Sequence, residues 1–360
     1  MKHRYVSWLL PAFAALCLFG ANGCDRTADS VVWERTYAGP DFVTPVAVIR
    51  SPDSGYAVLA NIRDKWTGAE GIWLLRLDDQ GDTIWTRTYI LSTETSASDI
   101  LPYADGWFII SGRSSGTPFL HTVRSDGQTE WSVTWPELSD DAANGIAPAP
   151  ESTVVMAGQG GWNLVSLQRT TPTGYVFWAR TCTLTFDTPS VQDVAKQDSG
   201  GYFICGGDFG LGVSESGESL WSHDYSSLGT VDLRKAEAAP GGGVYLAGSV
   251  YTETGSRIIC AKTASNGEVT WSRRVDDPPA SGWAVCADGG GGCYVVGGTD
   301  RTDDEDGIVV KLDAAGNIVW QREFNGPQYG ELVSAAMAPD GDVVVLGSTN
   351  NELRLLKLNP

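Results

Sequence analysis

One segment of the sequence has the residue types and spacing of a serine nucleophile. Residues 112–116 read Gly-Arg-Ser-Ser-Gly, which fits the Gly-x-Ser-x-Gly pattern of serine hydrolases. That chemistry needs a sharp turn from a strand into a helix, which leaves the serine hydroxyl exposed above the sheet. Here the motif follows an apolar strand and enters a short loop. The sequence therefore predicts a structural turn at this position and no catalytic residue.

Metal ligands are scarce in the sequence. After the first 30 residues only two histidines remain, His121 and His223, and both fall in segments that we expect to be framework strands. Residues 303–307 read Asp-Asp-Glu-Asp-Gly, and Ca²⁺ takes six to eight oxygen ligands. A calcium loop of the helix-loop-helix type would need an acid at Thr302 and a glutamate where Asp313 stands. We interpret the segment as a solvated acidic loop and predict no metal and no cofactor.

The elements that must position any site repeat along the chain. Seven tryptophans, each followed by a short alternating strand, recur at intervals of 43 to 52 residues: Trp33, Trp85, Trp131, Trp178, Trp221, Trp271 and Trp320. Glycine stands four residues before six of them, and glycine tolerates the positive φ of a tight turn. Each repeat also has an apolar strand ending near glycine, a loop of variable length and a second apolar strand. Nothing in residues 31–360 shows sustained helical periodicity.

This pattern predicts the fold. Four short antiparallel strands in a period of about 45 residues are typical of one β-propeller blade. The last repeat supplies VVVLG and LRLLKLNP but no tryptophan strand, whereas VVWERTY, at residues 31–37, is a tryptophan strand without the other three. We therefore predict an all-β, seven-bladed propeller of four-stranded antiparallel blades over residues 31–360. The N-terminal strand would join the three C-terminal strands, and this closure would remove an exposed sheet edge.

The repeat resembles the bacterial Trp-repeat propellers related to the quinoprotein (PQQ-like) superfamily. In that family the turn before the outer strand reads Asp-x-x-Thr-Gly-x-x-x-Trp. This sequence keeps Gly-x-x-x-Trp, but the threonine only at Thr173 and the aspartate only at Asp78 and Asp313. The resemblance implies that the tryptophan rings dock between neighbouring blades. Quinone-dependent members carry adjacent cysteines at the cofactor, and this chain has no Cys-Cys pair.

The first residues look like an export signal. A basic start at Lys2 precedes an apolar run from Tyr5 to Gly20, which is short for a membrane span of about 20 residues, so residues 1–23 are predicted to be a signal peptide. Ala-Asn-Gly before Cys24 resembles a bacterial lipobox, which implies lipidation of Cys24 and a short tether over residues 24–30. Ordinary cleavage at the same place is the alternative, because a lipobox usually has leucine where Ala-Asn-Gly begins. The expected location is the bacterial cell envelope, with a lipid anchor in the inner or outer membrane.

Charge limits the partners of the mature chain. Removing residues 1–23 removes two of the 25 basic residues and none of the 44 acidic ones, which leaves a net charge of −21. Such a charge argues against binding to nucleic acid or adsorption on anionic lipid. Five cysteines follow Cys24. Cys286 and Cys293 flank a glycine-rich turn and are spaced for a cross-strand disulfide, but we favour two small buried residues.

The loops offer candidate contact residues for a partner. In the predicted ring, short glycine-rich turns occupy one face, and the variable middle-strand loops and crossovers occupy the other, which we call the loop face. Loops carry function more often than the scaffold does. Trp66, Trp135, Phe186 and Tyr329 lie in or beside these loops and are candidate anchors for a ligand or partner. For each residue taken alone, packing within its loop is the favoured interpretation.

Polar residues on the inner strands are a second candidate site. They lie at roughly equivalent places in five repeats: Asp99, Asn144, Asp193, Lys235 and Ser334. They could line a polar channel that binds a small molecule, although a hydrated polar axis is the favoured interpretation. Together these features predict a non-catalytic envelope lipoprotein whose loop face binds a protein or glycan partner. The alternatives are a hydrolase or lyase with its site on the axis or loop face, and a structural spacer.

Overall fold

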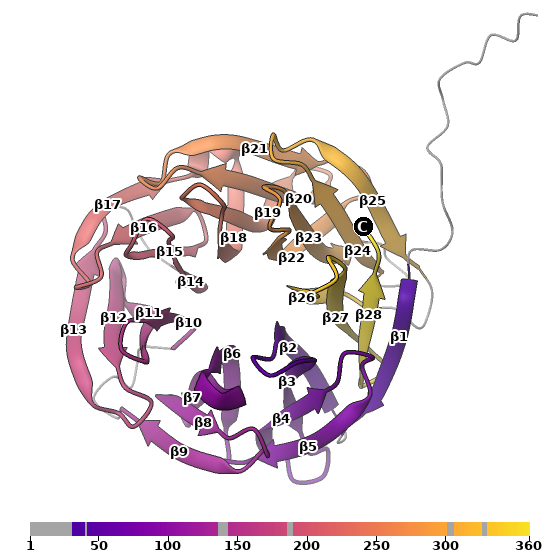
Figure 1. The fold of residues 1–360 in the computed structure, drawn as a ribbon. Coiled ribbons are helices and arrows are strands. Elements are labelled where there is room, and N and C mark those ends of the chain that lie inside the picture. Colours follow the sequence, from indigo (N-terminus) through magenta and orange to yellow (C-terminus); the bar gives the residue numbers. More distant parts are fainter. Residues whose placement is uncertain (1–30, 40–41, 136–142, 186–189, 301–305, 326–329) are drawn as a thin grey trace, which may run out of the picture.

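The chain folds into a ring of radial sheets around a central axis (Figure 1). The computed structural model describes residues 31–39, 42–135, 143–185, 190–300, 306–325 and 330–360. Within these residues 28 strands form seven four-stranded antiparallel sheets, and each sheet is one blade. The all-β, seven-bladed propeller predicted from the tryptophan repeat is confirmed. In the described part of the chain, no helix has the length and apolar character needed to cross a membrane.

The blades follow one another in sequence order, each built from the axis outward. Blades one to three contain β2 (Phe42–Arg50), β3 (Tyr56–Arg63), β4 (Glu70–Leu77) and β5 (Thr83–Tyr89); β6 (Thr95–Tyr103), β7 (Trp107–Ser114), β8 (Thr117–Val123) and β9 (Thr129–Thr134); and β10 (Gly145–Ala149), β11 (Thr153–Gly161), β12 (Leu164–Thr170) and β13 (Val176–Thr183). Blades four and five contain β14 (Asp193–Lys196), β15 (Tyr202–Gly206), β16 (Phe209–Val213) and β17 (Ser219–Asp224); and β18 (Thr230–Ala238), β19 (Val244–Thr252), β20 (Gly255–Thr263) and β21 (Val269–Val275).

The last two blades complete the ring. Blade six contains β22 (Ala280–Ala287), β23 (Cys293–Thr299), β24 (Gly307–Leu312) and β25 (Ile318–Phe324), and blade seven contains β26 (Leu332–Met337), β27 (Val343–Thr349), β28 (Glu352–Leu358) and β1 (Val31–Ala38). Two short 3-10 turns, η1 (Ala104–Gly106) and η3 (Ser226–Leu228), precede β7 and β18.

The ring closes by pairing the two ends of the described chain. β1 runs antiparallel to β28, with Trp33 opposite Lys357 and Tyr37 opposite Leu353. Figure 1 shows this closure as the indigo β1 beside the yellow β28. An ion pair between Arg354 and Glu34 also joins the two strands. The predicted closure of blade seven by the N-terminal strand is confirmed.

The outer strands lock each blade to the next. The Trp33 ring covers Gly81 in the outer turn of blade one, where an added Cβ would lie 3.0 Å from the ring. Gly81 has a φ of +78°, so glycine is required there both by the backbone and by the close approach. The Tyr37 hydroxyl donates a 2.6 Å hydrogen bond to the Gly81 carbonyl, and Tyr89 bonds the Gly127 carbonyl in the same way at 2.8 Å.

One outer strand departs from this arrangement. In blade two, the Trp131 ring packs against Trp107 at a centroid distance of 5.7 Å, and Val133 is the residue that approaches Gly174 of the next blade. The docking of tryptophan between blades therefore holds for most repeats, but blade two uses Val133 at the glycine.

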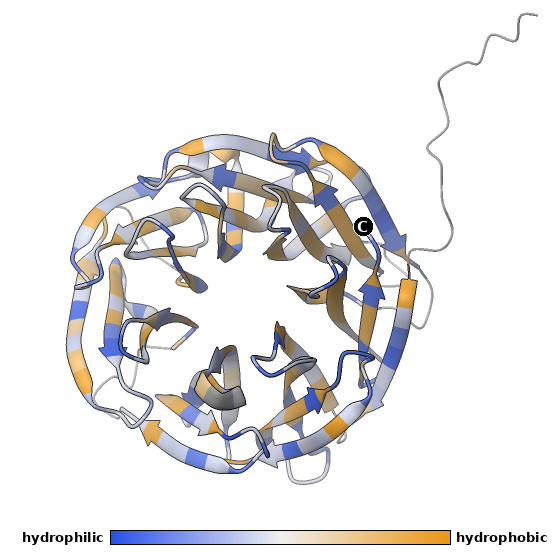
Figure 2. Cartoon of the chain, in the orientation of Figure 1, coloured by the Kyte–Doolittle hydropathy of each residue, from blue (hydrophilic) through white to orange (hydrophobic). Residues whose placement is uncertain are grey.

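The hydrophobic core lies between the blades. Seven clusters of buried residues each combine two neighbouring sheets, as in the contact of Tyr56 and Leu75 of blade one with Leu346 of blade seven. Figure 2 shows the apolar colour concentrated in the middle strands, whereas the outer strands alternate around the rim. Burial of each large apolar side chain contributes about 1.5–3 kcal/mol, so the blades depend on one another for stability.

The five cysteines within the described residues are reduced and buried. Cys293 pairs with Ala287 across the strands, and Cys286 pairs with Tyr294. Ala287 follows Cys286, and neighbouring residues of a strand point to opposite faces. Cys293, opposite Ala287, therefore faces away from Cys286, and the two cysteines lie in different clusters and form no disulfide. The favoured interpretation of two small buried residues is confirmed. Burial raises the pKa of the Cys286 thiol well above its ordinary value.

Candidate functional site

The inner strands carry one equivalent position around the axis. In β2, β6, β18, β22 and β26, the register shifts at the same place. Such a bulge re-aims the side chain that follows it. The residue after the shift is Asp99 in blade two, Lys235 in blade five and Ser334 in blade seven. Three of the five predicted axis residues therefore occupy this position, and Asp193 of β14 is bonded in the same way as Asp99.

These side chains bond the backbone of the next blade. The Ser334 hydroxyl accepts a 3.1 Å hydrogen bond from the Val48 N–H. The Asp99 carboxylate accepts one from the Ile146 N–H at 3.3 Å, and the Asp193 carboxylate accepts one from the Ala236 N–H at 2.9 Å. Each bond supplies a partner for an N–H of the innermost strand of the next blade, which is an edge strand of its sheet. The position therefore links consecutive blades.

Asn144 was grouped with these residues but behaves differently. In blade five, Lys235 immediately precedes the Ala236 N–H donor. In blade three, Gly145 holds that position before the Ile146 donor, and Asn144 stands one residue earlier. Its side-chain amide donates a 2.6 Å hydrogen bond to the Val191 carbonyl of blade four. A Cβ at Gly145 would lie 2.7 Å from the Val194 nitrogen, so the blades approach too closely there for a side chain.

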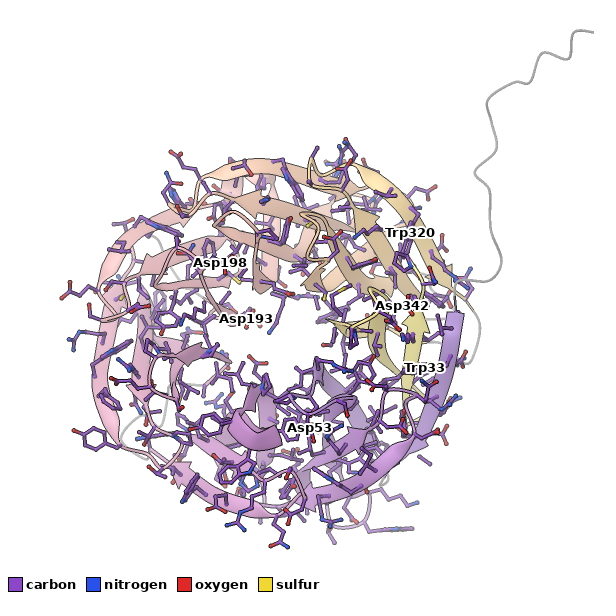
Figure 3. The ribbon with its side chains drawn as sticks, viewed as in Figure 1. Trp33, Asp53, Asp193, Asp198, Trp320 and Asp342 are labelled. Atoms are coloured by element: carbon purple, nitrogen blue, oxygen red, sulfur yellow. The ribbon has the colours of Figure 1, made fainter. Side chains whose placement is uncertain are left out.

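Three of the predicted axis residues form an ion cluster across the ring. The Lys235 ammonium lies 3.0 Å from an Asp193 oxygen and 3.7 Å from an Asp99 oxygen. Asp99 belongs to blade two and Lys235 to blade five, so the cluster connects blades that are not neighbours in the ring. Figure 3 shows Asp193 at the inner end of its blade, facing the central opening.

Burial and charge act in opposite directions in this cluster. Burial alone would lower the pKa of Lys235, but Asp193 and Asp99 outweigh it and hold that pKa above its ordinary value. Burial raises the pKa of Asp193, and the Lys235 charge offsets only part of this effect. The lysine therefore stays protonated, and its charge offsets part of the cost of burying the Asp193 carboxylate.

A further inner-strand acid, Glu237, was missed by the sequence analysis. It follows Lys235 by two residues on β18 and accepts a hydrogen bond from the Ala287 N–H of blade six. Burial raises the pKa of Glu237 to about 7, and the bond from Ala287 and the charge of Lys235 oppose this shift. No local pattern marks Glu237, because its burial depends on how blades five and six meet.

Replacing Glu237 with glutamine should remove a pH dependence of stability. The ordinary pKa of 4.5 is raised to about 7 on folding. The stability due to this shift is therefore fully present below pH 4.5 and is lost as the pH rises through 7. We expect Glu237→Gln to match the wild type at pH 4 and to be more stable at pH 8, by up to about 3 kcal/mol. Urea unfolding at the two pH values measures this difference.

The control for that measurement is Glu253→Gln, in the exposed turn between β19 and β20. This variant should change the free energy of unfolding by no more than about 0.5 kcal/mol at either pH. An equal difference between Glu237→Gln and the wild type at both pH values would show that Glu237 does not titrate on folding.

The catalytic patterns found in the sequence are parts of the framework. Residues 112–116 form the turn of the β7–β8 hairpin, and no helix follows. The Ser114 hydroxyl donates a 2.9 Å hydrogen bond to the Ser92 hydroxyl. His121 is 1% exposed, and burial lowers its pKa to about 4. The acidic segment 303–305 lies outside the described residues. In the described ranges, no three His, Cys, Asp or Glu side chains gather as a metal site.

A groove opens on the loop face between the inner parts of blades one and two. It has a volume of about 600 Å³. We call it the blade-one groove, and its lining includes Phe42, Arg63, Lys65, Glu70 and Ser96. Phe42 starts β2 and lies opposite Arg63 at the end of β3, while Ser96 lies near the start of β6. The groove is therefore built by the end of β3, the first residues of β2, β4 and β6, and the loop that contains Lys65.

Hydrogen bonds between the blades hold the walls of the blade-one groove in place. The Asn61 side chain accepts a 2.7 Å bond from the Ala97 N–H and donates a 3.0 Å bond to the Ala97 carbonyl. Asn61 thus pairs with β6 as a backbone unit would, and it fixes the distance between blades one and two. The groove is built on strands rather than on loops alone.

The loop beside the groove displays an exposed indole ring. The Asp64 carboxylate accepts hydrogen bonds from the Trp66 N–H at 2.9 Å and from the Thr67 N–H at 2.6 Å. These bonds, the Thr67 bonds above all, lower the pKa of Asp64. The turn leaves Trp66 83% exposed, with the Lys65 ammonium 5.1 Å from its ring centroid. Trp66 is therefore exposed in its loop, and its role as an anchor stays a prediction.

Trp135 was a candidate loop anchor for which packing was the favoured interpretation. It is 5% exposed and packs among Ile109, Leu120 and Met156 between blades two and three, so it does not lie as an anchor. It stands four residues after Trp131, where Tyr37 and Tyr89 stand in their own blades. The position belongs to the interblade contact, and Trp135 fills it with an indole ring in place of a phenol.

The other loop candidates have mixed outcomes. Phe186 and Tyr329 lie outside the described residues. Trp162, in the β11–β12 turn, is 78% exposed, and the sequence analysis did not single it out. Tyr251 at the end of β19 is also exposed. Both lie at middle-strand turns, so the repeat pattern itself could have marked them.

Comparison with known proteins agrees with the architecture. Residues 211–360 match the family model described as outer membrane protein assembly factor BamB. No curated protein matches the chain in sequence. Among solved structures, a streptogramin B lyase superposes with a TM-score of 0.65 at 11% identity, covering 91% of this chain and 98% of the lyase. A catalytically inactive virginiamycin B lyase from Staphylococcus aureus with quinupristin gives 0.65 at 12%, covering 91% and 99%.

A further solved structure is also similar in fold, although less so than the two lyases. Sqt1 from Chaetomium thermophilum superposes with a TM-score of 0.57 at 12% identity, covering 91% of this chain and 98% of Sqt1. At such identities the likeness concerns the fold and carries no activity. The closed ring shows that the chain is a seven-bladed β-propeller, and its residues 211–360 are similar to the PQQ-like family model.

Proposed function

We propose that this chain is a non-catalytic envelope lipoprotein whose loop face binds a protein or glycan partner at the blade-one groove. The observation that carries the proposal is the pairing of a 600 Å³ groove with Trp66, an indole 83% exposed beside it. Exposed aromatic rings next to a groove are the usual anchors of an interface. The groove lies on rigid strands of blades one and two, so its shape is available before a partner arrives.

The charges in the groove favour a polar partner. Arg63 and Lys65 line it together with Asp64 and Glu70, in a chain whose formal net charge is −19. Asp64 already accepts three hydrogen bonds within its own turn. Arg63 and Lys65 give the groove basic side chains, while Phe42 and Trp66 offer apolar and aromatic surface. This combination suits an extended peptide or a glycan.

The envelope location rests on two lines of support. The family model that matches residues 211–360 is described as an outer membrane protein assembly factor. The signal-like residues 1–23 and the lipobox-like segment at Cys24 would export the chain and anchor it by a lipid. Radiolabelled palmitate incorporated into the wild type but not into Cys24→Ala would establish the anchor, and equal labelling of both would exclude it.

Trp66→Ala should weaken capture of the partner from detergent-solubilised envelope by about tenfold or more. Loss of an aromatic anchor at the centre of an interface commonly costs about 2 kcal/mol or more. The matched control is Trp162→Ala, which removes an equally exposed indole from the β11–β12 turn of blade three. Quantitative mass spectrometry of the captured proteins and glycan staining of the same eluates provide the measurement.

The result would decide between the binding role and a passive spacer. Partners lost from Trp66→Ala but kept by Trp162→Ala would support the blade-one groove as the binding site. If both variants retain the wild-type set of partners at the wild-type yield, the groove is not the contact surface.

A further inference from the structure

The contact between blades two and three differs from the contacts on either side of it. In four other blades, a glycine of the second strand lies opposite a large apolar residue of the third strand: Phe119, Phe209, Ile259 and Ile308. In blade three the glycine is Gly158, and it lies opposite Ser166. A hydroxymethyl group therefore stands where those four blades place a buried ring or a branched chain, whereas blade seven has Arg354 opposite its glycine.

The neighbouring position on the same strand is also polar. Gln168 of β12 lies opposite Met156, where blades four and six have Leu211 and Val310. The Gln168 side chain is buried, with 5% exposed, and its Nε2 has no hydrogen-bond partner among the described residues. A buried donor without a partner costs about 1–3 kcal/mol, so an apolar residue would be more stable here if the position served packing alone.

A cavity lies at these two polar residues. It has a volume of about 180 Å³ and is lined by Pro118 of blade two and by Met156, Gly158, Ser166 and Gln168 of blade three. A cavity of about 150 Å³ is enough to hold benzene when its walls are apolar. Because Ser166 replaces the large side chain of other blades, the space is a direct consequence of the sequence at this one repeat.

The lining determines the class of ligand. Pro118, Met156 and Leu167 supply apolar wall, whereas Ser166 and Thr181 supply hydroxyls and Gln168 supplies the unpaired N–H. A carbonyl oxygen would accept from Gln168 Nε2 and satisfy it. Arg180 is the charged residue of the lining, and it is exposed on β13. Ser166 and Gln168 are uncharged, so a neutral ligand loses less hydration beside them than an ionised ligand would.

We propose that this interblade cavity is a binding site for a small neutral ligand that carries an apolar ring or branched chain and one carboxamide or carbonyl group. The apolar part fills the space left by Ser166, and the carbonyl oxygen accepts the hydrogen bond from Gln168 Nε2. The site lies between blades two and three, apart from the blade-one groove, and does not depend on the partner proposed for the loop face.

Benzamide is the probe for the test, because it joins a benzene ring to one carboxamide. Ligand-observed NMR titration of the full chain should give saturable binding with a Kd on the order of 1 mM, as expected for so small a molecule. Ser166→Phe copies Phe119 and Phe209 into blade three and should weaken benzamide binding by at least about tenfold. Trp162→Ala, in the same blade but outside the cavity lining, should bind benzamide like the wild type.

A second variant separates the hydrogen bond from the space. Gln168→Leu copies Leu211 of blade four, keeps an apolar cavity and removes the unpaired donor. It should lose about tenfold in affinity for benzamide and keep its affinity for toluene, which has no carbonyl. Thermal unfolding checks that both variants remain folded, and Gln168→Leu alone decides the matter if Ser166→Phe does not fold.

Three outcomes would overturn the proposal. The first is the absence of saturable benzamide binding to the wild type, which would mean that water alone occupies the cavity. The second is unchanged benzamide affinity in Ser166→Phe or Gln168→Leu. The third is tighter binding of benzoate than of benzamide, which would contradict the neutral class of ligand.

Discussion

A chain that lacks residues 31–38 should lose most of its stability, with a fall of about 5 kcal/mol or more in the free energy of unfolding. β1 buries Trp33 and Tyr37 against blades one and seven. Loss of a buried large aromatic side chain costs about 3–5 kcal/mol, and the whole stability of a domain is typically about 5–15 kcal/mol. The deletion would also leave β28 as an open edge, with its unpaired backbone groups exposed to other chains.

The control for this deletion is a chain that starts at residue 31 and therefore keeps β1. It should unfold at the same urea concentration as a chain that retains residues 24–30. A synthetic peptide of residues 31–38, added in excess, should restore part of the lost stability by pairing with β28. The account of ring closure would be contradicted if the deleted chain remained monomeric and as stable as the control.

Lys235→Ala should destabilise the propeller by about 3–5 kcal/mol near neutral pH. The substitution leaves Asp99 and Asp193 buried at the axis without their shared cation, and breaking a buried ion pair on one side costs about this much. Each carboxylate also accepts a backbone hydrogen bond from the next blade, so neither can turn away without leaving an N–H unpaired.

The loss should depend on pH in a defined direction. Burial already raises the pKa of Asp193 when Lys235 is present, and removal of the lysine raises it further. A raised folded-state pKa gives stability at low pH that is lost as the pH rises through that pKa. The difference between Lys235→Ala and the wild type should therefore be small near pH 4 and should grow toward pH 8.

Two further variants make this result specific. Lys196→Ala removes a lysine from β14, the neighbouring inner strand, and should cost no more than about 0.5 kcal/mol. Combining Lys235→Met with Asp99→Asn and Asp193→Asn should recover much of the lost stability, because no buried charge then lacks a partner. A cost for Lys235→Ala as small as that for Lys196→Ala would show that the ion cluster does not hold the axis together.

The fold could be predicted from the sequence because its determinants repeat and are local. Gly-x-x-x-Trp fixes a turn and an outer strand within a few residues, and it recurs in six repeats, from Trp85 to Trp320, while Trp33 begins a seventh tryptophan strand without the glycine. Figure 3 shows Trp33 and Trp320, from the first and last tryptophan strands, in the adjoining blades where the ring closes. Repetition also made the ring closure visible, because one tryptophan strand lacked its three companions.

The site could be predicted only in part. Trp66 was found because its loop is long and has no strand period, and the turn made by Asp64 keeps it exposed. Trp135 could not be assigned from the sequence, because a tryptophan at a strand end looks the same in sequence whether it faces solvent or the next blade. The structure buries it between blades two and three. Glu237 and Gln168 gave no signal in the sequence. The burial of Glu237 and the unpaired Nε2 of Gln168 depend on which residues of the neighbouring blade lie against them.

The pairing of β1 with β28 can be tested directly with two engineered cysteines. Ala38 and Glu352 are opposite each other in the register, and opposed residues have Cβ atoms about 4.5–5.5 Å apart, close to what a disulfide accepts. Ala38→Cys with Glu352→Cys should form a disulfide in high yield under mild oxidation, detected by peptide mapping, and Val32→Cys with Glu352→Cys should form none. Equal yields from the two pairs, or no crosslink from the first, would contradict a ring closed by its own N-terminal strand.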